Sequence, residues 1–188
     1  LESPSVEMMT READQRAQDL IRQARQGDVE AYNSLALCYR DGDGVEKSWL
    51  NTICMYAIYS QKTGGDIENV IELFEEGDPV ILLLEIVTSP SFDKKVEKKV
   101  RQLKQSLPAE AKAIEAARRA FTMGEAAEAI NVFREAEEEG SELAVIFQAV
   151  YYDGAKDKTG QEECLTSIAK KYPFFNLMLG ESYARKYG

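Results

Sequence analysis

The stretch AYNSLALCYRDGDGV, residues 31–45, runs from apolar residues at helical spacing into a cluster of aspartates and glycines. Ala31, Leu35 and Tyr39 lie four residues apart, which places them on one face of a helix. Gly42 and Gly44 can adopt left-handed backbone conformations, which end one helix and relieve the turn before the next. The stretch therefore predicts two helices joined by a tight hinge.

Two binding functions for the aspartate and glycine cluster are disfavoured by spacing. A calcium loop counted from Asp41 would need an oxygen ligand, a glycine and a glutamate where the chain has Val45, Glu46 and Thr52. A phosphate-binding loop is also disfavoured, because there is no GxxxxGK[ST] motif and no GxGxxG that follows a strand. We therefore expect a hinge at this cluster, with no metal and no cofactor bound.

The pattern recurs along the chain. Gly27 and Asp41 of the first copy correspond to Gly140 and Asp153 of a second, and a third copy is partial. Small residues would let two helix backbones approach closely, while tyrosines fill the space beside them. The repeat positions are Ala31, Leu35, Ala36, Tyr39, Gly42 and Gly44, then Ala144, Ala149, Tyr152 and Gly154, and finally Leu179, Gly180 and Tyr183.

Apolar residues three and four apart fill most windows of the chain, which predicts an all-α fold of about 10 to 11 helices. We expect one domain over residues 1–188, repeat-like over 28–64 and 109–187, with an irregular helical middle at 66–108. The apolar segment 80–87 is expected to be a buried helix. The residues expected to face inward include Met8, Trp49, Ile53, Tyr56, Ala57, Ser60, Ile67, Val70, Ile71 and Phe74.

On these repeat residues the chain resembles the Sel-one-like repeat family, relatives of tetratricopeptide repeats. The first half of that pattern, A-x-x-x-L-G-x-x-Y-x-x-G-x-G-V, is similar to residues 31–45, with Ala36 in the small-residue slot. The segment EAINVFREAEEEG, residues 128–140, is similar to the second half. The resemblance implies an α-α superhelix, a short solenoid of antiparallel helix pairs whose concave groove binds a peptide or a partner protein.

The related tetratricopeptide geometry also implies which side chains line such a groove. An extended peptide with an acidic or carboxyl-terminal group would then face Arg40. The implied groove residues are Asn33, Leu37 and Arg40 in the first copy, Ile146, Val150 and Asp153 in the second, and Leu177, Glu181 and Ala184 with neighbouring Arg185 in the third.

The composition removes several classes of function. The chain has no histidine, so histidine-dependent nucleophiles and metal sites are excluded. Its 23 basic against 33 acidic residues give a net charge of -10, which argues against a nucleic-acid partner. Cys38, Cys54 and Cys164 lie among apolar residues and are expected to be buried thiols, although a Cys38–Cys54 bridge stays open.

The chain also contains a basic stretch, an acidic stretch and a group of aromatic residues. The basic stretch 94–104 is either a solvated helix face or a weak contact for an anionic surface or an acidic partner. The acidic stretch 135–140 could pair with it. Five aromatic residues near the C terminus are expected to seal the end of the core: Tyr172, Phe174, Phe175, Tyr183 and Tyr187.

These observations favour a non-enzymatic protein-interaction scaffold. The alternatives are a structural or cell-envelope-associated module and, less favoured, an enzyme that uses carboxylate or cysteine chemistry. The longest apolar run, residues 79–87, carries Glu85 and is half the length of a membrane span. We therefore expect a soluble chain, cytoplasmic, or periplasmic or extracellular if a removed signal peptide preceded Leu1.

Overall fold

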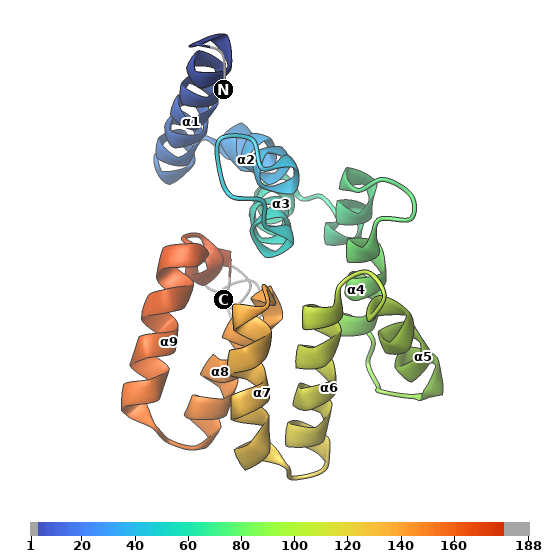
Figure 1. Cartoon of the computed structure of the whole chain (residues 1–188). Coiled ribbons are helices and arrows are strands. Elements are labelled where there is room, and N and C mark those ends of the chain that lie inside the picture. The colour runs from blue at the N-terminus through green and yellow to red at the C-terminus, as the bar shows by residue number, and fades with distance from the viewer. Residues whose placement is uncertain (1–3, 179–188) are drawn as a thin grey trace. The chain divides into compact units, whose positions relative to one another are not determined.

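The computed structural model describes residues 4–178, and every regular element among them is a helix. Figure 1 shows this all-α architecture, which confirms the predicted fold class. Eleven helices begin within the described part, the last at residue 175. The others are α1 (Pro4–Arg25), α2 (Val29–Asp41), α3 (Trp49–Thr63), the 3-10 helix η1 (Ile67–Leu73), α4 (Pro79–Val87), α5 (Lys94–Leu103), α6 (Pro108–Thr122), α7 (Ala126–Glu138), α8 (Glu142–Gly154) and α9 (Lys158–Lys171).

The chain divides into two compact units. Unit 1 comprises residues 1–75 and 172–188, and unit 2 comprises residues 76–171. The first unit therefore contains α1, α2, α3 and η1, and the second contains α4 to α9. A single repeat array over residues 1–188 and its superhelical winding stay predictions.

In unit 1, α2 and α3 form a helical hairpin around the predicted hinge. Asp28 caps the start of α2, and Gly42 ends it in a left-handed conformation with φ 70°. Ser48 then caps α3 by accepting a hydrogen bond from the backbone N–H of Asn51. The predicted face of α2 is buried, namely Ala31, Leu35, Ala36 and Tyr39, and Tyr32 is buried as well.

The inward face of α3 agrees with the expectation only in part: Ala57 and Ser60 are buried as predicted. Trp49, Ile53 and Tyr56 remain partly exposed. Apolar residues surround most of this helix, so their spacing does not fix which side turns inward. Local capping contributes to the burial of Thr52, whose hydroxyl donates to the Ser48 carbonyl at 2.8 Å. The buried apolar residues of α3 are Leu50, Cys54, Met55, Ala57 and Ile58.

The segment expected to be an α-helix over residues 66–76 is instead the 3-10 helix η1. A 3-10 helix has three residues per turn, so the α-helical spacing of the apolar residues no longer defines one face. Val70 is buried, Phe74 is half-buried, and Ile67 and Ile71 are exposed. Met8 of α1, also expected to face inward, is exposed as well.

Residues 172–178 close the core of unit 1. Phe174 is buried and meets the ring of Tyr32 edge to face at 5.6 Å. The Arg25 guanidinium lies 5.7 Å from the centre of the Phe174 ring. Tyr172 is also buried and Phe175 is half-buried. This agrees with the predicted aromatic seal, whose other members, Tyr183 and Tyr187, lie outside the described residues.

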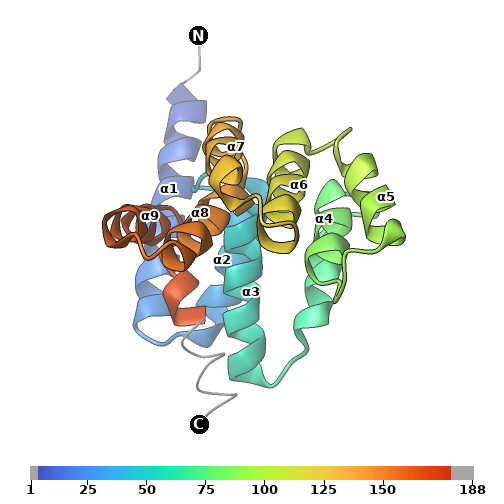
Figure 2. The same ribbon diagram turned by 90° about the horizontal axis from the view of Figure 1, so that it is seen from below.

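In unit 2, α6, α7, α8 and α9 lie side by side, as Figures 1 and 2 both show. Helix α6 packs against both α7 and α8, and α8 packs against α9. Small side chains allow these close approaches. The central cluster consists of Ala113, Ala116, Ala117, Ala120, Ala129, Ile130, Phe133, Ala136 and Ala144. The buried segment 80–87 is helical as predicted, within α4.

The second repeat copy departs from the first after Tyr152. Gly154 lies inside α8, and the left-handed residue is Lys156, with φ 57°. The Asp157 N–H then bonds to the Tyr152 carbonyl at 3.0 Å. A Cβ atom on Gly160 would come within 2.5 Å of the Tyr152 ring, so the close contact of this copy lies on α9. Ala149 is half-buried, whereas Ala36 is fully buried.

The ion pairs of unit 2 also differ from the expectation that the acidic stretch 135–140 pairs with the basic stretch 94–104. Lys112 of α6 lies 3.1 Å from both Glu135 and Glu139, and Lys171 lies 3.9 Å from Glu137. The basic stretch 94–104 instead pairs through Lys99 with Glu85 of α4 and through Lys104 with Glu115 of α6. No pair joins the two stretches within residues 4–178. Most of the ion-pair partners of each stretch lie on helices that pack directly against it.

Candidate functional site

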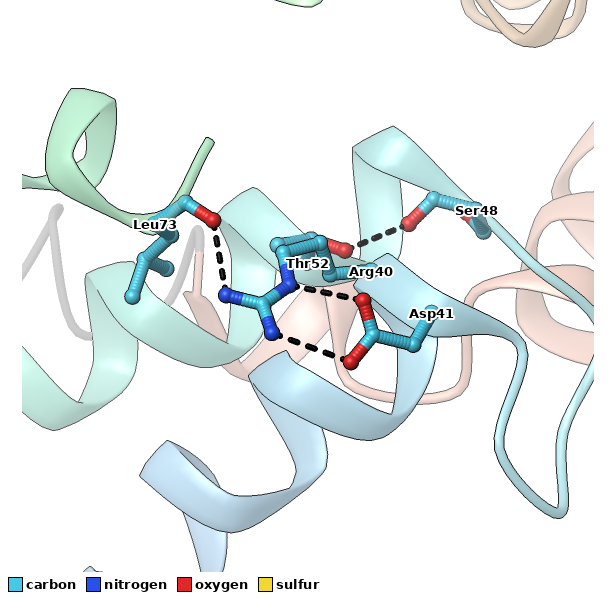
Figure 3. Close-up of polar contacts among 5 residues, drawn as sticks. All are labelled: Arg40, Asp41, Ser48, Thr52 and Leu73. Carbon is cyan, nitrogen blue, oxygen red and sulfur yellow. Dashed lines mark hydrogen bonds and ion pairs between the residues drawn. The ribbon is translucent and has the colours of Figure 1, made fainter. Parts of the chain in front are cut away.

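Arg40, the proposed anchor for an acidic peptide end, makes three hydrogen bonds within unit 1. Its Nε and Nη2 atoms donate to both carboxylate oxygens of Asp41 at 2.8 and 2.9 Å. Its Nη1 atom donates to the Leu73 carbonyl at 2.8 Å, as Figure 3 shows. The hydrogen bond to Asp41 raises the pKa of Arg40 and lowers the pKa of Asp41. The guanidinium therefore joins the end of α2 to the end of η1.

The other groove residues inferred from the resemblance have varied surroundings. Asn33 and Leu37 on α2 are half-buried, as is Ile146 on α8. Val150 is exposed, and Asp153 accepts a hydrogen bond from Gln161 at 3.2 Å. Leu177 is exposed. The α2 residues belong to unit 1 and the α8 residues to unit 2. The remaining groove residues lie beyond residue 178, outside the described part: Glu181, Ala184 and Arg185. The same is true of the repeat residues of the third copy: Leu179, Gly180 and Tyr183.

Replacing Arg40 with Gln is expected to increase amide hydrogen exchange in η1 at neutral pH, because the Leu73 carbonyl loses its donor. The bond to Arg40 holds the pKa of Asp41 below its ordinary value of 3.8 in the folded protein. The pair therefore stabilises the fold above pH 3.8, and its contribution disappears as pH falls through the lower folded pKa. Urea unfolding of both proteins at several pH values should show their stability difference shrinking in acid. A difference that grows in acid would contradict this prediction.

A second feature of unit 1 was not foreseen in the sequence: α1 packs directly on the hinge. Gly44 has φ 73°, and a Cβ atom placed on it would lie 2.2 Å from the Ala13 carbonyl oxygen. It would also lie 2.9 Å from the Cβ atom of Ala17. Next to this contact, the Arg16 guanidinium lies 3.7 Å from Asp43. Gly44 therefore serves close helix packing as well as the turn.

An open groove of about 640 Å³ lies between α1 and the hinge. Its apolar lining includes Val6 and Met9 of α1, and Val45 of the hinge. Val6 is 44% exposed and Met9 is 66% exposed, so both side chains offer apolar surface to solvent. The two-methionine stretch at positions 8 and 9 was the available sequence signal. Met8 was expected to face the core because its spacing fits a helix face, and Met9 was given no part in that face.

The charges that line this groove are mainly negative. One guanidinium, Arg16, is accompanied by four carboxylates: Glu12, Asp14, Asp43 and Glu46. Arg16 already pairs with Asp43. The hinge carboxylates Asp41 and Asp43 thus each have an arginine partner. Within residues 4–178, no group of three or more acidic or cysteine side chains is arranged to hold a metal ion.

The three cysteines are free thiols. Cys54 has no exposed surface, and Cys38 and Cys164 are half-buried. Burial raises the pKa of Cys38 and of Cys164 above the ordinary value of 9.0, and nearby carboxylates raise it further. A raised pKa lowers the thiolate fraction at neutral pH, and the thiolate is the nucleophile.

We therefore expect slow alkylation of the folded chain by iodoacetamide at pH 7.5. Cys38 and Cys164 should react more slowly than the same residues in urea, and Cys54 should not react before unfolding. Mass spectrometry of peptides from a labelling time course measures the three rates. Reaction of Cys38 or Cys164 at a rate above that in urea would indicate an activated thiol and contradict this prediction.

No described helix combines the length and the apolar character needed to cross a bilayer. Comparison with family models, with curated proteins and with solved structures gave no match.

Proposed function

We propose that this chain is a non-enzymatic protein-interaction scaffold that binds a peptide or a partner protein on a helical-repeat surface. The observation that carries the proposal is the open groove between α1 and the hinge, where Val6 and Met9 are exposed. An exposed apolar patch with a polar rim is typical of a protein interaction site. Methionine suits such a surface because its flexible side chain adapts to different partners.

The helix pairs support a repeat of the Sel-one-like kind. In unit 1, the resemblance is supported by the buried Ala31, Leu35, Ala36 and Tyr39 and by the left-handed glycines of the hinge. In unit 2, α6 contacts both its hairpin partner α7 and the following α8. Neighbouring helix pairs in solenoids make contacts of this type. Such an array offers binding surface and leaves its core closed.

The thiols also favour a non-enzymatic function. A cysteine nucleophile needs a lowered pKa, which a nearby cation or a helix N terminus supplies. Burial instead raises the pKa of Cys38 and Cys164. The guanidinium of Arg40 is bonded to Asp41 and Leu73, so the α1 groove is a better candidate for the binding surface than the α2 face.

Site-specific photo-crosslinking tests this proposal. A benzophenone amino acid placed at Met9 should give a discrete covalent adduct with a partner in an extract of the source cells. The same amino acid placed at Met8 should give little of this adduct, because Met8 is exposed but does not line the groove. The purified partner should then bind Met9→Ser about fivefold or more weakly than Met8→Ser. Equal adducts and equal affinities for the two positions would reject the proposal.

Helix α5 supports a second, weaker contact with an anionic surface. Lys94, Lys95, Lys98 and Arg101 are exposed and form no ion pair within the described residues. Four cations on one short helix attract anionic lipid headgroups, and salt screens that attraction.

Co-sedimentation with vesicles tests the α5 contact. Vesicles rich in phosphatidylglycerol should bind the chain, whereas phosphatidylcholine vesicles should not. The Lys94→Gln/Lys98→Gln variant should bind less than the Lys158→Gln/Lys170→Gln variant, which removes the same charge from exposed positions of α9. Equal binding of the two variants would reject the α5 contact.

A further inference from the structure

We infer that the groove between α1 and the hinge binds a basic segment of a partner protein, with one or two apolar side chains inserted between lysines or arginines. This inference rests on the proposed function and specifies the chemistry of the partner. The groove is open to solvent, with a volume of about 640 Å³, and apolar side chains line part of it. It can therefore accept side chains.

The apolar part of the groove calls for apolar anchors. Val6 and Met9 lie one helical turn apart on α1, and Val45 approaches from the hinge. Burying such exposed apolar side chains against a partner removes them from water and so stabilises a complex. The flexible Met9 side chain can adjust to an aliphatic or an aromatic anchor.

The charged side chains that line the groove determine which kind of partner segment binds there. The Asp43 carboxylate is neutralised by Arg16 at 3.7 Å. The carboxylates of Glu12, Asp14 and Glu46 also line the groove, and no ion pair within residues 4–178 engages them. An acidic segment would be repelled by these three charges, while a segment carrying lysine or arginine would be attracted.

The charge of the whole chain acts in the same direction. Its net charge of -10 creates a negative potential that raises the association rate of a basic partner. Rim charges at an interface contribute mainly to association rate and to partner choice, whereas buried anchors slow dissociation. We therefore expect selectivity from the carboxylates and residence time from Met9.

Three synthetic peptides of about fourteen residues test this inference on the full chain by fluorescence anisotropy. The first carries two leucines four residues apart among lysines, the second has glutamate for every lysine, and the third has serine for both leucines. The first should bind about tenfold or more tightly than either of the others. Its affinity should fall as salt is raised.

Matched variants locate the binding. Met9→Ser should lower the affinity for the first peptide about fivefold, and Met8→Ser should lower it less than about twofold. Glu12→Gln/Glu46→Gln should lower this affinity about threefold or more. The control variant Glu68→Gln/Glu72→Gln removes two exposed carboxylates of η1 and should leave the affinity almost unchanged. Circular dichroism confirms that each variant folds.

Two outcomes overturn the inference in different ways. If lysine and glutamate peptides bind equally and both weaken in Met9→Ser, the basic partner is rejected while the groove remains a binding site. If Met9→Ser and Met8→Ser bind the lysine peptide with the same affinity, the peptide does not occupy the groove and the inference is rejected. The proposed scaffold function itself fails only if the crosslinking at Met9 and Met8 is also equal.

Discussion

Replacing Gly44 with Ala is expected to lower the free energy of unfolding of unit 1 by about 3 kcal/mol. The added Cβ atom would meet the Ala13 carbonyl oxygen at 2.2 Å, and that atom belongs to the backbone of α1. A helix backbone cannot rotate away as a flexible side chain does, so α1 must move off the hinge. The φ of 73° at Gly44 adds about 1 kcal/mol, because residues with a Cβ atom rarely adopt it.

Gly27→Ala is the matched control for this variant. Gly27 has φ 95°, and nothing lies within 4 Å of the position its Cβ atom would occupy. The Gly27→Ala substitution should therefore lower the free energy of unfolding only through the backbone strain of its left-handed conformation, by about 1 kcal/mol. Urea unfolding gives both free energies, and hydrogen exchange should show faster exchange over α1 in Gly44→Ala alone. Equal costs for the two variants would show that α1 does not pack on the hinge in solution.

Gly44 also connects fold and proposed function, because it is the point at which one wall of the groove contacts the other. Separating α1 from the hinge removes the groove without changing Val6, Met9 or Val45. We therefore expect Gly44→Ala to lose the binding of the lysine peptide, whereas Gly27→Ala should keep it.

Local signals placed the helices correctly in the sequence. Asp93 caps α5, Pro108 is the first residue of α6, and Ser141 caps α8. Such residues act within one turn of the backbone, so the sequence alone predicts them. The hinge glycines belong to the same class, since the left-handed conformation is a local preference.

Features that depend on neighbouring elements were not predictable in this way. The inward face of α3 was predicted only in part, because apolar residues surround the helix and only its neighbours select one side. The end of η1 is held by a tertiary contact that no local pattern predicts, since Arg40 of α2 donates a hydrogen bond to the Leu73 carbonyl. Gly154 resembled Gly42 in sequence, yet α8 continues past the equivalent of Asp41, and the left-handed residue follows at Lys156.

The candidate groove was missed for the same reason. Its two walls are separated along the chain by α2, and no periodic pattern links α1 to the hinge. The exposed Met8 was expected to face the core, because hydrophobic spacing alone cannot distinguish a buried face from a binding face. Tertiary structure was needed to separate Met9, which lines the groove, from Met8, which does not.

Glu110 of α6 gives the largest expected effect in unit 2. It is only 3% exposed, and its Oε1 atom accepts a hydrogen bond from the Glu142 N–H at 2.5 Å. Its Oε2 atom accepts from the Ser141 hydroxyl at 3.1 Å and from the Leu143 N–H at 3.3 Å. The carboxylate therefore caps the N terminus of α8, where backbone N–H groups have no partner within the helix and the dipole favours a negative charge.

Replacing Glu110 with Ala should lower the free energy of unfolding of unit 2 by about 3 kcal/mol, because buried donors at the start of α8 lose their acceptor. Glu110→Gln should cost about half as much, since the amide retains one acceptor oxygen. Glu115→Ala, on the same helix, is the control. It removes a partly exposed pair with Lys104 at 2.8 Å and should cost less than about 1 kcal/mol. Urea unfolding measures all three, and hydrogen exchange at residues 142–144 reports the cap directly. If Glu110→Ala cost no more than Glu115→Ala, water would be replacing the carboxylate, and the cap would not hold α8 against α6.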